Sequence, residues 1–190
     1  MSAAVQGTSL TVPITATHDG DAVIIAVALA GTYTADVTTV TAANGQRLFR
    51  DAVGTTFGAC DRTIELWSGR NIAADVTSIE VGLTSSATVG AYELEVSGLS
   101  AYPLVQTTNI GTSAPPTPDA PLFAEPGPLV LASFTTCGSL RGLKQGSTFV
   151  AFDPQLDSDL AYVIATASGS YAAQWNYDTG ASDQYTLVYR

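Results

Sequence analysis

The chain holds one histidine, His18, within Thr17-His18-Asp19-Gly20. A nucleophilic triad needs a base such as histidine to accept the proton of a serine or cysteine. Turn-forming residues follow His18, so we expect it in an exposed loop. The sequence also lacks a G-x-S-x-G elbow, an H-E-x-x-H motif and a phosphate-binding loop. We therefore predict that the protein is not an enzyme and has no catalytic residues.

Paired carboxylates could serve a glycosidase mechanism, which needs two acids at a fixed separation. Glu93 and Glu95 share the outward face of an alternating segment, and Glu80 could lie opposite them. Nothing in the sequence would separate their pKa values, as an acid and base pair requires. We interpret these residues as a solubilising face.

Closely spaced aspartates could instead bind calcium, which prefers several oxygen ligands. Asp153, Asp157 and Asp159 lie within seven residues, and Asp19 and Asp21 flank Gly20. Neither spacing matches an EF-hand loop. We predict no metal and no cofactor, and keep Asp153, Asp157 and Asp159 as the candidates for calcium.

Trp67 and Trp175 are the remaining candidate site residues, because sugar-binding modules stack sugars on exposed aromatic rings. The alternative is that both rings cover the core, where large aromatic side chains are usually found. We favour burial and keep Trp67 and Trp175 as a possible ligand platform.

The two cysteines, Cys60 and Cys137, stand 77 positions apart without the spacing of a zinc site. A disulfide is possible if the strands bring them together. We favour two small buried thiols and expect no bond that supports folding.

Composition excludes several partners. Seven Lys and Arg stand against seventeen Asp and Glu, giving a net charge of −10. Nucleic acid and anionic membranes both attract clustered cations, so we expect neither as a partner. The longest aliphatic run, Ala22 to Ala30, is too short for a membrane helix and is typical of a buried strand.

Alternating β-branched and aromatic residues predict strands throughout, about ten or eleven in number. Ile79, Val81 and Leu83 should face one side, as should Tyr92, Leu94 and Val96. Three segments are apolar on both faces and predict central strands: Val23–Leu29, Leu129–Phe134 and Thr148–Phe152. Asn44-Gly45 predicts a hairpin turn. Ser170 to Arg190 predicts a closing hairpin with Trp175 near the core.

Seven of the nine prolines lie between Tyr102 and Pro128. Proline removes a ladder donor and fixes φ, so this stretch cannot be a central strand. We interpret residues 102–128 as a crossing connection and residues 1–8 as an N-terminal arm. The predicted fold is all-β: one two-sheet antiparallel jelly-roll-like sandwich over residues 1–190, with a long Pro-rich connection.

Three segments carry a resemblance to a known family: Val37 to Gly45, Thr63 to Ile72, and Ala161 to Trp175, with a close at Tyr185 to Arg190. They resemble a jelly-roll-like domain of secreted actinobacterial proteins and of tail or capsid-associated proteins of their phages. The resemblance spans nearly the whole chain and implies a fold more strongly than a function.

No basic and apolar leader opens the sequence, although its composition is that of an extracellular β domain. We therefore expect a bacteriophage virion protein assembled in the host cytoplasm. A capsid decoration protein is favoured, bound as a homo-oligomer to the major capsid protein or other virion proteins. The alternative is an extracellular carbohydrate-binding or host-surface adhesive module. We expect the assembly surface in the Pro-rich segment or at residues 1–7.

Overall fold

The structure is a computed structural model that describes residues 2–15, 17–31, 35–56, 60–99, 106–111, 122–124, 126–154, 156–178 and 180–189. Every regular element within these ranges is a strand, and fifteen strands form four antiparallel sheets. The predicted all-β, jelly-roll-like sandwich is confirmed. The strands exceed the expected ten or eleven because several of the two- to four-residue pairings give no visible sequence period.

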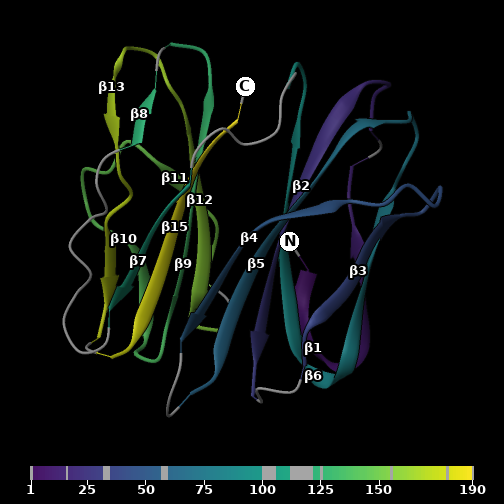
Figure 1. The fold of residues 1–190 in the computed structure, drawn as a ribbon, viewed down its shortest axis with the longest axis horizontal. Helices are drawn as coiled ribbons and strands as arrows, with labels where there is room; N and C mark the ends of the chain where they lie inside the picture. Colours follow the sequence, from purple (N-terminus) through teal and green to yellow (C-terminus); the bar gives the residue numbers. More distant parts are fainter. Residues whose placement is uncertain are drawn as a thin grey trace.

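Sheet A is built from the first half of the chain (Figure 1). Its strands are β1 (Ser2–Pro13), β2 (Asp21–Ala30), β3 (Val37–Ala42), β4 (Phe49–Thr56), β5 (Arg62–Ile72) and β6 (Ser78–Val96). Their order is β1-β6-β2-β5-β4, and β3 pairs with the first part of β6. The long β6 pairs directly with β1, β2 and β3. β5 is linked to it through β2, and β4 is linked through β5.

Sheet B is built from the second half, with the order β11-β12-β9-β15-β7. Its strands are β7 (Gln106–Gly111), β9 (Leu129–Thr136), β11 (Val150–Ala151), β12 (Ser158–Ile164) and β15 (Ser182–Tyr189). Two short pairs lie beside it: β8 (Leu122–Ala124) with β13 (Gly169–Tyr171), and β10 (Leu140–Leu143) with β14 (Trp175–Tyr177). Sheets A and B stand face to face in Figure 1.

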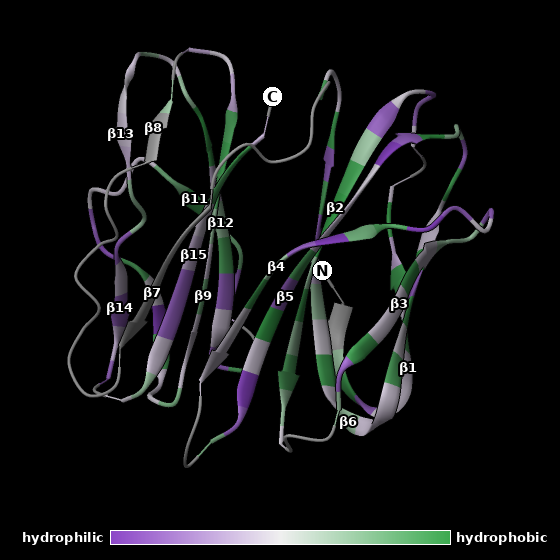
Figure 2. Cartoon of the chain, in the orientation of Figure 1, coloured by the Kyte–Doolittle hydropathy of each residue, from purple (hydrophilic) through white to green (hydrophobic). Residues whose placement is uncertain are grey.

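Strict alternation along the central strands distributes the apolar residues over three clusters. Alternate residues of β2 belong to two clusters. One cluster is formed within sheet A and contains Val23, Ile25, Val27 and Leu29. The other lies between sheets A and B and contains Ile24 and Ala26. In β9, Leu129 and Leu131 point back toward sheet A, and Val130, Ala132 and Phe134 point outward. Both sheets are therefore covered on two faces, and Figure 2 shows hydrophobic colour along β2, β5 and β9.

The central cluster lies between sheets A and B and joins the two halves. Sheet A contributes Ile64, Leu66 and Tyr92, and sheet B contributes Leu131, Leu160 and Leu187 among others. The buried Tyr92 hydroxyl donates a hydrogen bond to the Ser158 carbonyl at 2.6 Å, so a polar contact also crosses this layer. The predicted extent of a single domain, residues 1–190, stays a prediction, with this shared core in its favour.

The central strands Val23–Leu29 and Leu129–Phe134 are confirmed, since β2 and β9 are buried throughout and paired on both sides. The prediction for Thr148–Phe152 is wrong. Only Val150 and Ala151 form a strand there, at the edge of sheet B, and the Val150 side chain is exposed. Asn44-Gly45 does form a turn, closed by the Gly45 N–H to the Ala42 carbonyl, with Gly45 at φ +89°.

The predicted closing hairpin is also wrong. The last strand, β15, lies between β9 and β7, whereas β13 and β14 pair with β8 and β10. Trp175 is nevertheless buried. The segment expected as an arm belongs to β1 from Ser2 onward and pairs with β6. Most of the Pro-rich segment, including residues 112–121, lies outside the described residues.

Candidate functional sites

A turn and a strand end bring His18 next to two carboxylates. Asp21 opens β2, Glu95 lies near the end of β6, and His18 precedes the turn at Asp19-Gly20. The His18 Nδ1 atom lies 3.3 Å from Asp21 Oδ2 and 3.6 Å from Glu95 Oε1. Within the described ranges, this is the one group of three or more His, Cys, Asp or Glu side chains placed close enough to share an ion. The expected loop position of His18 is confirmed, because its side chain is 87% exposed.

The calcium candidates are not brought together. Asp153 is exposed, whereas Asp157 forms an ion pair with Arg62 at 2.9 Å. Asp159 is fully buried in β12, and its Oδ1 accepts the Leu160 backbone N–H at 2.7 Å. Burial raises the pKa of Asp159 to about 8, because a charged carboxylate loses its hydration there. Asp159 is therefore a titratable core residue, and these three aspartates do not form a calcium site in this structure.

Of the three glutamates on β6, only Glu80 lies apart from the other two. Glu80 is exposed and lies opposite Thr11 and Thr41, far along the strand from Glu93. Burial raises the pKa of Glu93. Glu93 and Glu95 pair with Ile25 and Val23 of β2 and so share one face of the strand, but both side chains are half-buried rather than fully solvated.

Trp67 lies inside the molecule beside a buried acid that the sequence did not reveal. Glu65 is only 1% exposed, and it accepts hydrogen bonds from Trp67 Nε1 at 3.1 Å and Arg50 Nη1 at 3.4 Å. Burial raises the pKa of Glu65, although Arg50 opposes the shift. The Arg50 guanidinium also lies 6.0 Å from the centre of the Trp67 ring. Trp67 also borders the small pocket beside Phe49, but at 9% exposure its ring offers little surface on which a sugar could stack.

Trp175 is buried in the outer cluster of sheet B. Its ring stacks on Phe134, with centroids 5.5 Å apart, and Tyr177 approaches the same phenyl ring at 4.8 Å. Trp67 and Trp175 therefore do not form an exposed platform in this structure. The exposed aromatic beside Trp67 is Phe49 in β4, at 60% exposure. It borders a pocket of about 180 Å³ that Arg47 and Arg50 also line.

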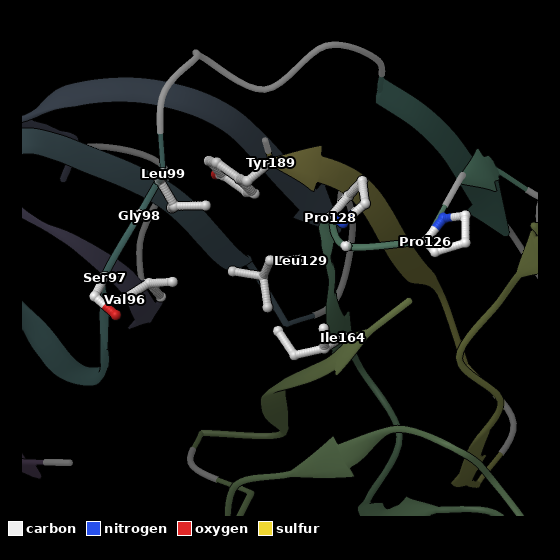
Figure 3. A pocket seen from close by; sticks show the side chains of 10 residues that line it. Val96, Ser97, Gly98, Leu99, Pro126, Pro128, Leu129, Ile164 and Tyr189 are labelled. Carbon is white, nitrogen blue, oxygen red and sulfur yellow. The ribbon is translucent and has the colours of Figure 1, made fainter. Parts of the chain in front are cut away.

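A larger pocket of about 450 Å³ opens at one end of the central layer (Figure 3). Its lining comes from both halves: Val96 to Leu99 after β6, Pro126 to Leu129 before β9, and Ile164 and Tyr189. The lining is mainly apolar, and the Tyr189 hydroxyl is occupied by a 2.8 Å hydrogen bond to Asp51. Among the described residues, no acid, base or thiol lines this pocket, so it is a mainly apolar cavity without reactive side chains.

Cys60 and Cys137 form a disulfide, so the prediction of two free buried thiols is wrong. Cys60 stands between β4 and β5, and Cys137 follows β9, with the two Cα atoms 5.4 Å apart. The bond therefore links sheet A to sheet B. Both residues are partly exposed and within reach of a reductant.

No protein family, curated protein or solved structure matches this chain. Within the described residues, no helix is long and apolar enough to cross a membrane.

Proposed function

We propose that the protein is a non-enzymatic structural component of a bacteriophage virion, a capsid decoration protein that binds the major capsid protein. The observation that carries the proposal is the outer edge of β1. This strand ends sheet A and pairs only with β6 among the described strands. It contains no charged residue, and most side chains from Ala4 to Thr11 are exposed.

An open strand edge presents unpaired N–H and C=O groups that can add a strand from another chain. Soluble proteins usually protect such edges with charge, proline or bulges, and of these β1 has Pro13 at its end and two pairing irregularities but no charge. Pairing irregularities after Ser2 and after Gly7 interrupt β1, and they leave Ser9–Pro13 as the longest regular run. The Val5 side chain, at 42% exposure, adds apolar surface beside it. This edge suits assembly onto a neighbouring protein.

The interior suits a structural role. Three apolar clusters fill the described part of the molecule, and a disulfide joins the two sheets. Disulfides persist in oxidising surroundings, which a virion meets after cell lysis. The bond also fits the alternative of a secreted module, so location must be tested directly.

The test is quantitative mass spectrometry of purified particles from the phage that encodes the chain. Hundreds of copies per particle support a capsid decoration protein, and a few copies per particle indicate a tail protein instead. Absence from the particles overturns the proposal.

A pair of variants tests the edge itself. Thr11→Lys places a charge on the exposed face of β1, and Ala74→Lys adds the same charge in an exposed turn between β5 and β6. We expect Thr11→Lys alone to lower occupancy on capsids that lack the protein. Equal occupancy of both variants removes β1 from the assembly surface.

One observation favours the second candidate, a carbohydrate-binding or host-surface adhesive module. Phe49 exposes an aromatic ring beside Arg47 and Arg50, a combination that could contact an acidic glycan. Phe49→Ala should then abolish binding to host cells and leave the melting temperature unchanged. Unchanged cell binding by this variant removes the Phe49 surface from that candidate.

A further inference from the structure

We propose that His18, Asp21 and Glu95 bind one divalent transition-metal ion, and that Zn²⁺ fits them best. The donors are one imidazole nitrogen and two carboxylates. Imidazole favours zinc and its neighbours in the first transition row, whereas calcium and magnesium prefer an all-oxygen set. Three protein ligands and one open position is the composition of an open zinc site.

The two distances from the imidazole nitrogen to the carboxylate oxygens match the edges of a tetrahedron around an ion. Zinc bonds to nitrogen and oxygen measure about 2.0–2.2 Å, so two ligand atoms on one tetrahedron stand about 3.3–3.6 Å apart. His18 Nδ1 lies 3.3 Å from Asp21 Oδ2 and 3.6 Å from Glu95 Oε1. All the donor atoms lie within 4.8 Å of one another. An ion can therefore enter with small side-chain rotations.

The backbone holds two of the ligands in place before any ion binds. Asp21 Oδ2 accepts the His18 backbone N–H at 2.9 Å, and the Asp21 N–H donates to the His18 carbonyl. The buried Thr17 fixes the entry to the turn, since its hydroxyl donates to the Ala73 carbonyl at 2.6 Å. Gly20 lies at φ +87°, a conformation that glycine adopts without strain. Glu95 is fixed separately, by the pairing of β6 with β2.

Electrostatics leave a place for a cation. Glu95 Oε1 is shielded from solvent and has no hydrogen-bond partner, although it faces the imidazole. Asp21 is buried as well, so a cation held between its carboxylate and that of Glu95 would offset the repulsion of two neighbouring negative charges.

The exposed imidazole forms the open side of this site. Its 87% exposure leaves the ion a route from solvent and a free fourth position for water. Because Asp21 begins β2 and Glu95 lies near the end of β6, a bound ion would also tie the turn to the strand pair. We therefore expect binding to raise the melting temperature.

The experiment is calorimetric titration of Zn²⁺ into EDTA-treated, dialysed protein without a histidine tag. We expect one Zn²⁺ per chain, and at least a tenfold loss of affinity in both His18→Ala and Glu95→Gln. Asp19→Asn is the matched control, since it removes one carboxylate from the same turn without removing a donor. Its affinity should stay within twofold of the wild type.

The single histidine allows zinc binding to be followed by NMR, independently of the heat measured in the calorimetric titration. One imidazole signal in the NMR spectrum should shift on addition of one equivalent of Zn²⁺ and return with EDTA. Absence of saturable binding up to 1 mM Zn²⁺ overturns the proposal. Unchanged affinity in His18→Ala, or a preference for Ca²⁺ over Zn²⁺, overturns it equally. Circular dichroism of each variant shows that a loss of binding does not reflect a loss of fold.

Discussion

Reduction of the Cys60–Cys137 disulfide should destabilise the protein strongly. The bond closes a loop across 77 residues of sequence and connects the two facing sheets. In the chain-entropy description, a cross-link of this span removes unfolded-state entropy equivalent to about 4.5 kcal/mol at 25 °C. The expected loss in the free energy of unfolding on removing the bond is therefore about 2–4.5 kcal/mol, because measured effects often fall below the entropic value.

The loss can be read as a shift in melting temperature. For a chain of 190 residues, each kcal/mol moves the midpoint by about 2–4 °C. The full entropic value therefore corresponds to a fall of about 9–18 °C. Thermal unfolding followed by circular dichroism, with and without reductant, measures it.

Two controls isolate the bond. The Cys60→Ser/Cys137→Ser double variant should have the same melting temperature as the reduced wild type, and reductant should not change it. Mass spectrometry of alkylated samples should show no free thiol before reduction and two afterwards. Coincident melting of fully oxidised and fully reduced protein would refute the reasoning, and free thiols in the native protein would refute the pairing itself.

Three further predictions concern the buried layers. Trp175→Ala should cost about 3–5 kcal/mol in urea unfolding, because the ring packs on Phe134 in the outer cluster of sheet B; normal unfolding would show that the ring is not packed in the core. The wild type should lose stability relative to Asp159→Asn as pH rises from about 4 to 8, by up to about 1.4 kcal/mol per pH unit. The sign follows because the folded-state pKa of about 8 lies above the usual 3.8, so the native state holds the proton more tightly; parallel pH profiles would contradict it. Tyr92→Phe should cost about 1–3 kcal/mol, since it leaves the buried Ser158 carbonyl without this donor; an unchanged denaturation midpoint would show that the bond adds nothing.

The strand core could be predicted from the sequence because its cause is local. Val23 to Leu29 is apolar on both faces, and β2 is buried on both faces. Ile79, Val81 and Leu83 alternate with polar residues, and all three are buried as expected. These patterns state how many faces of a strand are covered, but not which strand lies beside it.

Pairing between distant strands was the part that local patterns could not supply. Nothing in the residues of β15 indicates insertion between β9 and β7 rather than a hairpin with the segment before it. The Cys60–Cys137 bond was missed for the same reason, since it depends on the approach of two sheets. The burial of Glu65 had no signal in the sequence, because it depends on Arg50 and Trp67, which folding brings near its carboxylate.

The candidate metal site combines a part that local sequence predicts with a part that depends on strand pairing. The turn at Asp19-Gly20 was visible in the sequence, and so was the exposure of His18. Glu95 lies in a different strand, and its approach to Asp21 depends on the register in which Val23 pairs with Glu95. A sequence signal for that contact would require knowledge of which strands are neighbours.

The order of sheets along the chain sets an order of events during synthesis. All strands of sheet A leave the ribosome before any strand of sheet B, yet among the described residues it is mainly sheet B that covers the inner face of sheet A. At about 5–20 residues per second, the 93 residues that follow Val96 up to Tyr189 take about 5–19 s to make. During that interval Ile24, Ile64 and Leu66 lack the residues of sheet B that cover them in the folded protein. We therefore expect the nascent chain to need protection from aggregation until β15 emerges and pairs with β9 and β7.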